Sequence, residues 1–136
     1  MYNEIFSSAR YFVICDYSPS LRRLLIRADK RKGYDINLDI VFFDTDYIQL
    51  ASMLNGIKVH LLDKTSASVP NIPNYEALSK YLSFEDNNLF ELESNDGAKY
   101  YIAASFVKVF ENEFEFNETS LNLEKQDQLK EIASSR

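Results

Sequence analysis

The sequence predicts a mostly antiparallel β protein of the α+β class, with seven or eight strands in a partial barrel or sandwich and one or two short helices. Apolar and polar residues alternate with period two over most of the chain, as in strands with one buried face. Most segments between these runs are short, which favours antiparallel pairing, and there is no strand–helix alternation of the parallel type. A chain of 136 residues has the length of one domain, so we expect residues 1–136 to form a single domain.

The first third of the chain predicts three strands, at residues 10–16, 21–29 and 36–42, with turn residues at 18–20 and 30–33. The first strand is apolar on both faces, so we expect it at the centre of the sheet and Cys15 to be buried in it. In the second strand the alternation separates an apolar face from a mixed one. The apolar face holds Leu24, Ile26 and Ala28, and the opposite face holds Arg23, Leu25, Arg27 and Asp29.

The middle of the chain predicts a hairpin and a helix. Asn55-Gly56 lies between two apolar runs, 47–54 and 57–62, and this dipeptide suits the two positive φ angles of a type I′ turn. After a loop with two prolines, residues 75–82 carry one apolar stripe at helical spacing. We expect Asn74 or Asn71 to cap that helix.

The last third predicts further strands and a weakly ordered end. If Phe90 and Leu92 face the core, Glu91 and Glu93 face water. Period-two alternation then continues over residues 99–116, which is too long for an ordinary strand, so we expect a bend or break near Glu111-Asn112. Residues 120–136 are expected to form a weak helix or a frayed tail.

Composition excludes several classes of protein. No apolar run approaches the roughly 18 residues of a membrane span, and the first residues lack the pattern of a secretory signal, so we expect a cytoplasmic protein. The net charge is −6 and is unevenly distributed: residues 1–33 hold seven basic and three acidic residues, and the rest hold eight basic and eighteen acidic ones. The acidic part would repel nucleic acid and attract a basic partner.

Metal and cofactor chemistry is not expected. With one cysteine and one histidine, disulfides and zinc sites built from several Cys or His are excluded. A Cys15–His60 nucleophile pair is conceivable, but Cys15 lies in an apolar run, and His60 shares its expected solvated face with Lys58. We therefore expect no catalytic residues and no cofactor.

One string resembles enzyme motifs. Val41-Phe42-Phe43-Asp44-Thr45-Asp46, an apolar strand that ends in Asp-x-Asp, is similar to the nucleophile motif of haloacid-dehalogenase-like phosphatases and to the metal-binding pair of many glycosyltransferases. Two such carboxylates can hold a divalent ion. No helix pattern follows Asp46 and no Gly-rich phosphate loop is present, so a metal-dependent enzyme that uses Asp44 and Asp46 remains an alternative only.

Two charged clusters are candidates for binding. The basic one comprises Arg22, Arg23, Arg27, Lys30, Arg31 and Lys32, and it either contacts nucleic acid or pairs with the protein's own acidic strands. The acidic candidates for contact with a basic protein are Glu111, Glu113 and Glu115 in one row, Glu91 and Glu93 in another, and Asp44 and Asp46. The alternative for the glutamate rows is a charged edge strand that resists aggregation.

Three segments together resemble a known kind of protein: RYFVICDYSPSLRRLLIRADK (10–30), NLDIVFFDTDYIQLASMLNGIKV (37–59) and YYIAASFVKVFENEFEF (100–116). They are similar to small acidic bacterial proteins, some of which look like the immunity proteins of contact-dependent or polymorphic toxins. This resemblance implies a non-catalytic antitoxin-like protein that occludes the active site of a basic toxin domain, without assigning a role to any residue. The nineteen Phe and Tyr residues leave a second alternative, a β-barrel that binds a small ligand in an aromatic-lined cavity.

Overall fold

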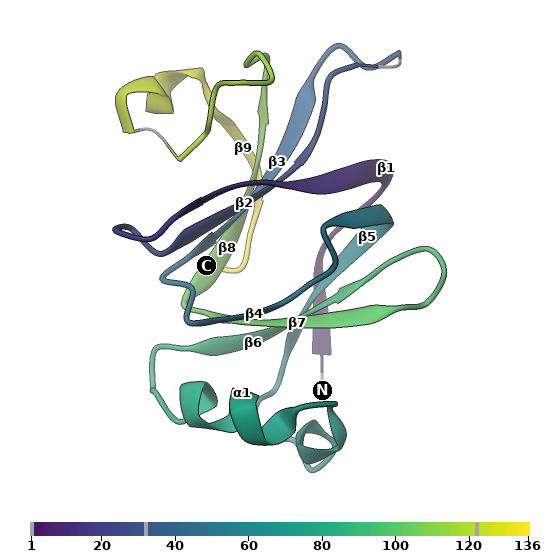
Figure 1. The fold of residues 1–136 in the computed structure, drawn as a ribbon, viewed down its shortest axis with the longest axis vertical. Coiled ribbons are helices and arrows are strands. Elements are labelled where there is room, and N and C mark those ends of the chain that lie inside the picture. Colours follow the sequence, from purple (N-terminus) through teal and green to yellow (C-terminus); the bar gives the residue numbers. More distant parts are fainter. Residues whose placement is uncertain (1, 32, 122) are drawn as a thin grey trace.

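The computed structural model describes residues 2–31, 33–121 and 123–136, and their dominant feature is one antiparallel sheet (Figure 1). Its nine strands are β1 (Tyr2–Ser18), β2 (Arg23–Ala28), β3 (Asn37–Phe43), β4 (Tyr47–Gln49), β5 (Met53–Leu62), β6 (Asn88–Glu93), β7 (Lys99–Ala104), β8 (Phe106–Asn112) and β9 (Lys130–Ser134). The strand order is β4-β7-β6-β5-β1-β2-β3-β8-β9. One α-helix, α1 (Tyr75–Leu82), and two 3-10 turns, η1 (Val69–Asn71) and η2 (Leu123–Gln128), complete the described elements.

The open sheet curls because the same two chain segments pair with each other twice, once near each end of the strand order. Residues 37–49 pair with residues 101–112, first as β3 with β8 and then as β4 with β7. Between these two pairings, backbone hydrogen bonds of 2.9 Å join Ser105 N to Phe43 O and Asp46 N to Ala103 O. The curl brings the rings of Phe42 on β3 and Phe90 on β6 to 5.4 Å between centroids, although three strands separate β3 from β6 in the order.

Side chains from both halves of the curled sheet fill one central core. Its largest members are Phe12, Phe42 and Phe90, all fully buried. Two smaller apolar clusters cover the outer face. On the β6–β7 half, α1 packs Leu78 and Leu82 against the strands, and on the β2–β3–β8 half the chain after β8 contributes Leu121. The sheet is therefore buried on both faces over much of its area.

The strand count and the predicted tail differ from the structure. We expected seven or eight strands, and there are nine in one open sheet. The first strand begins at Tyr2 rather than at residue 10, since the residues from Tyr2 to Ser8 also pair with β5. For residues 120–136 we expected a weak helix or a frayed tail, and the structure has the short 3-10 helix η2 followed by β9, which pairs with the outer edge of β8. The central position of β1 and the helix at 75–82 are confirmed, although the Asn74 side chain makes no capping hydrogen bond.

The predicted hairpin at Asn55-Gly56 is wrong, and the reason is local. Both residues lie inside β5, where the register with β1 shifts between Ser8 and Tyr11. Gly56 does adopt the positive φ that the dipeptide favours, at 77°, but it does so within a strand, opposite the extra residue that bulges β1 between Ser8 and Tyr11. The bulge also lets Asn95 approach, and its N–H donates to Asn55 O at 2.9 Å.

The period-two pattern of residues 99–116 breaks earlier than expected. The strand pairing with β3 does end at Asn112, but the alternation already changes phase at Ser105. Tyr100, Ile102 and Ala104 face the central core before this residue, and Val107 and Val109 face it afterwards. Phe106 consequently lies on the outer face, where its ring stacks on Phe43 at 4.4 Å.

Replacing Gly56 by alanine tests the bulge. A Cβ atom built at Gly56 would lie 2.2 Å from the side chain of Asn95, whereas one at Gly97, also at positive φ, would meet nothing within 4 Å. We expect both Gly56→Ala and Gly97→Ala to cost about 1 kcal/mol for the left-handed backbone, and Gly56→Ala to cost more because Asn95 must move. Urea unfolding measures the free energy of unfolding of the two variants. Equal losses of stability would contradict the close approach of Asn95 to Gly56.

Candidate functional site

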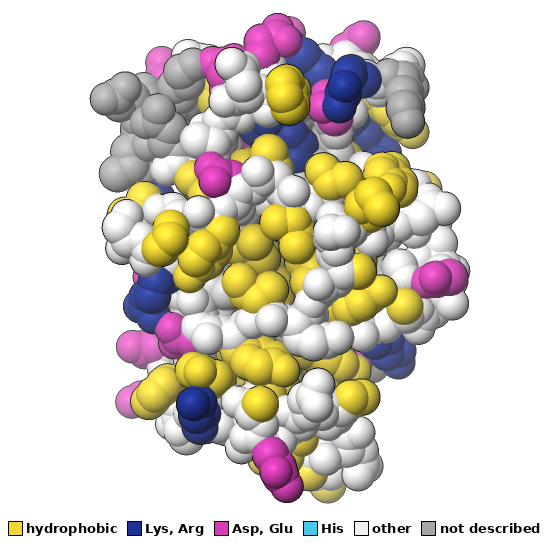
Figure 2. Space-filling view, in the orientation of Figure 1, with side chains coloured by type: hydrophobic (Ala, Val, Ile, Leu, Met, Phe, Trp, Pro, Cys, Tyr) yellow, Lys and Arg dark blue, Asp and Glu magenta, His cyan; other side chains and the backbone are white. Residues whose placement is uncertain are grey.

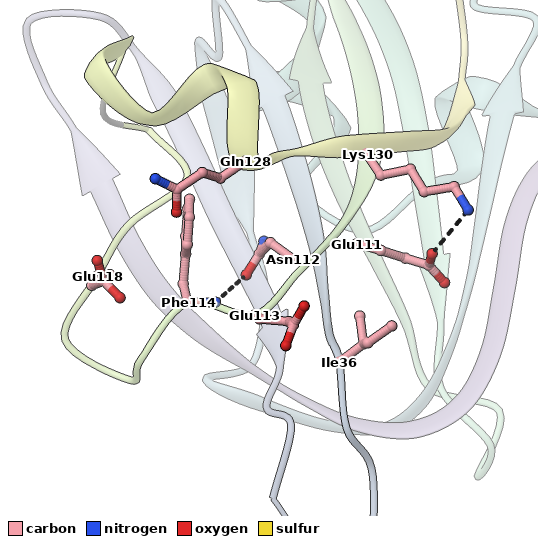
Figure 3. Close-up of a pocket in the computed structure, with 8 residues that line it drawn as sticks. All are labelled: Ile36, Glu111, Asn112, Glu113, Phe114, Glu118, Gln128 and Lys130. Carbon is pink, nitrogen blue, oxygen red and sulfur yellow. Dashed lines mark hydrogen bonds and ion pairs between the residues drawn. The ribbon is translucent and has the colours of Figure 1, made fainter.

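An acidic cavity lies where the end of β8 meets the loop before β3 and the segment that follows η2 (Figure 3). Its volume is about 460 Å³, and it is lined by Ile36, Glu111, Asn112, Glu113, Phe114, Glu118, Gln128 and Lys130. The charged residues in the described part of this lining are Glu111, Glu113, Glu118 and Lys130, and Lys130 Nζ lies 3.8 Å from the Glu111 carboxylate. The lining combines two members of the predicted glutamate row and their neighbours with residues from two other parts of the sequence, Ile36 and the pair Gln128 and Lys130.

The floor of this region is built on a buried ion pair between neighbouring strands. Arg27 on β2 and Asp39 on β3 are register partners on the outer face of the sheet, with exposed fractions of 2% and 0%. The guanidinium group donates to both carboxylate oxygens, from Nε at 2.7 Å and from Nη2 at 2.9 Å. Its third nitrogen, Nη1, donates to Glu118 O at 2.7 Å. The pair therefore anchors the backbone of the chain that leaves β8.

Two buried asparagines extend this network to the acidic segment. Asn112 Nδ2 donates to Asp39 Oδ2 at 2.8 Å, and Asn37 Nδ2 donates to Asn112 Oδ1 at 2.9 Å and to Phe114 O at 2.8 Å. In return, the N–H of Phe114 donates to Asn112 Oδ1 at 3.1 Å. These bonds fix the chain direction just after Asn112, so that Glu113 and Glu115 leave the strand as exposed residues.

Arg27 and Asp39 neutralise each other's charge inside the protein. Burial alone would lower the pKa of Arg27, but its hydrogen bond to Asp39 and the negative charge of that carboxylate raise the pKa above its ordinary value. Arg27 therefore stays cationic at any physiological pH, and the carboxylate of Asp39 has a permanent partner.

The three glutamates of the predicted row do not share one strand face. Only Glu111 lies in β8, and its carboxylate is 3.8 Å from Lys130 Nζ, while Glu115 lies 3.2 Å from Lys30 Nζ. Of the residues that the structure describes, none places a cation within ion-pair range of the Glu113 carboxylate. Neither Arg23 nor Arg27 neutralises the row, since Arg23 lies over the ring of Phe43 and Arg27 binds Asp39.

Exposed apolar side chains lie close to these carboxylates. Ile36 lines the cavity and is 38% exposed, and Phe116, one residue beyond Glu115, is 74% exposed. On the face shown in Figure 2, hydrophobic side chains gather across the middle, and charged side chains of both signs lie around them, several at the upper end near η2. Ile36 in the cavity lining and Phe116 on the chain after β8 thus add exposed apolar side chains to the acidic segment.

Asp44 and Asp46, the predicted metal or partner residues, are held by a cation of the protein itself. Arg22 lies 3.8 Å from Asp44 and forms an ion pair with Asp46, whose other oxygen accepts a 2.8 Å hydrogen bond from Asn87 Nδ2. Asp44 adopts a positive φ of 51° in the turn between β3 and β4. Together with the Arg27–Asp39 and Lys30–Glu115 pairs, this contact shows that basic residues of the N-terminal cluster pair with the protein's own acids. Lys32 of that cluster lies outside the described residues.

The expected solvent exposure of His60 and Glu91 is wrong. Both side chains lie on the outer face of β5 and β6 as register partners, and their exposed fractions are 5% and 7%. Glu91 accepts a 3.1 Å hydrogen bond from the Tyr101 hydroxyl. Burial and the neighbouring negative charge of Glu91 raise the pKa of Tyr101 to about 12. Glu91 therefore cannot offer its carboxylate to a protein surface, whereas half-buried Glu93 remains accessible.

Cys15 is exposed rather than buried, because β1 bulges between Ile14 and Asp16 and turns the intervening residue outward. Partial burial of the sulfur raises the pKa of this thiol, which keeps it protonated at neutral pH. Glu4, the register partner of His60, lies near the opposite end of β1, so the structure does not bring Cys15 and His60 together.

Among the residues that organise the acidic cavity, Arg27 was predicted only as a member of the basic cluster, and its partner Asp39 was not predicted as a site residue. Arg27 and Asp39 each lie between two apolar residues in a predicted strand, and the two strands are consecutive in the sequence. Two opposite charges in such positions indicate a buried ion pair, so the sequence did hold a signal for this pair. Lys130 and Gln128 could not be placed, because the tail carries no clear strand pattern. Ile36 joins the cavity only through the loop before β3.

Comparison with known proteins gives no family. No family model matches the sequence, and searches of curated proteins and of solved structures return no significant match. None of the helices in the described parts of the chain has the length and apolar character to cross a membrane. The functional proposal therefore depends on the chemistry of the residues themselves.

Replacement of Arg27 tests the buried pair. Arg27→Met leaves the Asp39 carboxylate buried without its cation, and we expect the free energy of unfolding to fall by about 3–5 kcal/mol. The matched control is Arg31→Met, which removes an arginine that is 72% exposed and pairs with Asp29, and it should cost less than about 1 kcal/mol. Urea denaturation followed by circular dichroism gives the free energy of unfolding of both variants. Similar small losses of stability would show that the Arg27–Asp39 pair does not anchor the chain that leaves β8.

The raised pKa of Tyr101 makes a pH prediction. Since the folded-state pKa is about 12 against an ordinary value of 10, the stabilising contribution of Tyr101 is complete below pH 10 and disappears as pH rises toward 12. Absorbance of tyrosinate at high pH should show one late step among the nine tyrosines. That step should be missing in Tyr101→Phe and unchanged in Tyr34→Phe, an exposed control.

Proposed function

We propose that this protein is a non-catalytic protein-binding module whose acidic cavity receives a basic side chain of a partner protein. The observation that carries the proposal is the acidic lining of the cavity: Glu111 pairs with Lys130, but among the described residues no cation lies within ion-pair range of the Glu113 carboxylate. A lysine or arginine that entered the cavity would pair with Glu113. Arginine fits best, since its planar guanidinium can bind two carboxylate oxygens at once.

The surroundings of the cavity favour a protein over a small cation. Protein interfaces combine buried apolar anchors with charges that set orientation. Ile36 and Phe116 offer exposed apolar surface beside Glu113 and Glu115. The Arg27–Asp39 network holds this backbone in place before a partner arrives, which lowers the entropic cost of binding.

We further propose that the partner is a toxin domain and that the protein acts as its immunity or antitoxin protein in the cytoplasm. The net charge of −6, with the whole of the acidic excess after residue 33, would steer a basic domain toward the acidic end of the sheet. Binding there would then block the toxin's active site sterically. The resemblance of three chain segments to immunity proteins supports this partner class.

The two alternatives find less support. We infer that the curled sheet is a partial barrel, yet the fully buried rings of Phe12, Phe42 and Phe90 occupy its centre, and none of the five described cavities is lined by them. A ligand carrier would need that space. For a metal-dependent enzyme, Asp44 and Asp46 would have to release Arg22 before they could bind an ion.

A charge-matched pair of variants tests the proposed binding surface. In Glu111→Gln/Glu113→Gln/Glu115→Gln the acidic end loses three charges, and in Glu76→Gln/Glu85→Gln/Asp86→Asn the exposed surface around α1 loses the same number. The partner to use is the product of the gene adjacent to the one that encodes this chain. We expect the first variant to lower the association rate and the affinity by about tenfold or more, because it removes both steering and contact charges.

Two readouts decide the outcome. Binding kinetics at several salt concentrations should show a strong salt dependence for the wild type and for the α1 control, and a weak one for the acidic-end variant. In cells that express the adjacent gene, the wild type and the control should protect growth. The proposal fails if the wild type forms no complex, or if the acidic-end variant binds and protects as well as the wild type.

A further inference from the structure

A row of polar side chains crosses the outer face of the other half of the sheet. Glu4 on β1, His60 on β5, Glu91 on β6 and Tyr101 on β7 are register partners in succession. Glu93 lies two residues beyond Glu91 and therefore on the same face of β6. The row borders the surface covered by η1 and α1, so His60 and Glu91 are shielded from solvent on one side.

Three of these side chains converge. His60, Glu91 and Glu93 each offer one potential ligand atom, and these three atoms lie within 4.8 Å of one another. His60 and Glu91 are buried. His60 Nδ1 is 3.6 Å from Glu91 Oε1. Two ligand atoms at this separation, each about 2.1 Å from a common ion, would subtend an angle near 120° at that ion, which is close to the angles of a zinc site.

We propose that His60, Glu91 and Glu93 bind one divalent transition-metal ion, of which Zn²⁺ is the best fit. The two oxygens of Glu91 have separate surroundings: Oε2 accepts the hydrogen bond of the Tyr101 hydroxyl, and Oε1 faces His60 Nδ1. The other ring nitrogen, His60 Nε2, lies 3.8 Å from Glu4 Oε1. A metal-bound histidine commonly directs its second nitrogen toward a carboxylate, and Glu4 occupies that place.

The remaining charges favour a cation at this point. Lys58 and Lys99 are the register partners of Glu93 on either side, but both are exposed. Of the described residues, neither lysine nor any other basic side chain comes within ion-pair range of the Glu93 carboxylate. Glu91 and Glu93 bring two carboxylates to this position, one of them buried, and the imidazole of His60 is the other member of the group. A bound cation would balance the charge of the two carboxylates.

The donor set selects among ions. An imidazole nitrogen with two carboxylates suits Zn²⁺, whereas Ca²⁺ and Mg²⁺ prefer sites built from oxygen alone. A cavity of about 320 Å³ adjoins the cluster and is lined in part by Glu91, Lys99 and Tyr101. The fourth position on the ion would therefore open onto space for a water molecule. This site lies on the β5–β6–β7 half of the sheet and is independent of the proposed protein-binding cavity.

Zinc titration of the chelator-treated full chain tests the proposal. We expect isothermal titration calorimetry with ZnCl₂ to show saturable binding of one ion per chain, and Zn²⁺ to raise the unfolding temperature. Glu93→Gln and His60→Gln should each lower the affinity more than about tenfold, since each removes a ligand. Glu113→Gln, which removes an exposed carboxylate elsewhere, should bind Zn²⁺ like the wild type, and Ca²⁺ or Mg²⁺ should not compete.

Each other outcome overturns the site. If the wild type shows no saturable binding, or if Glu93→Gln binds as tightly as the wild type, the cluster is a structural ion pair between His60 and the glutamates. An equal loss in Glu113→Gln would indicate diffuse binding to acidic surface, and competition by Ca²⁺ would exclude the imidazole as a ligand. Because Glu93 is half-buried, Glu93→Gln should keep the metal-free unfolding temperature of the wild type and remains decisive if His60→Gln fails to fold.

Discussion

The buried pair of Arg27 and Asp39 is the constraint on which the acidic end of the molecule depends. On the outer face of three adjacent strands, β2, β3 and β8, the pair lies next to the apolar cluster of Leu25, Val41, Phe110 and Leu121. The guanidinium group satisfies the carboxylate and also binds a backbone carbonyl of the covering segment. A purely apolar pair could pack at this position, but it could not fix the direction in which the chain leaves β8.

The curl of the sheet determines where the two candidate sites lie. Because residues 37–49 and 101–112 pair along both β3–β8 and β4–β7, the sheet encloses one core and leaves two separate outer surfaces. One outer surface carries the Arg27–Asp39 network and the acidic cavity, and the other carries His60 with its carboxylate neighbours. The outer surface with His60 is covered by η1 and α1, and the other is covered by the chain that follows β8. A polar network borders each of these segments, so each site lies at the boundary between a buried apolar cluster and solvent.

The sequence was sufficient for the parts of the fold that depend on local pattern. The inward face of β2, the helix at 75–82 and the predominance of antiparallel strands all follow from hydrophobic periodicity. The errors occurred where distant segments decide the outcome: Gly56 lies inside a strand because β5 pairs with β1 across a bulge, and His60 is buried between Glu4 and Glu91. The glutamate row was divided by the end of β8 at Asn112, close to the break that strand length predicted, but the sequence did not show which way the chain turns there.

Hydrogen–deuterium exchange of Asp39→Asn, compared with the wild type, most directly tests the claim that the buried pair holds the acidic segment. In the wild type the Phe114 amide is bonded to Asn112, which itself donates to Asp39. The account predicts that exchange in residues 113–121 accelerates strongly in the variant, while residues 53–62 of β5 remain protected under native conditions. Unchanged exchange in residues 113–121, or an equal acceleration throughout the sheet, would contradict it.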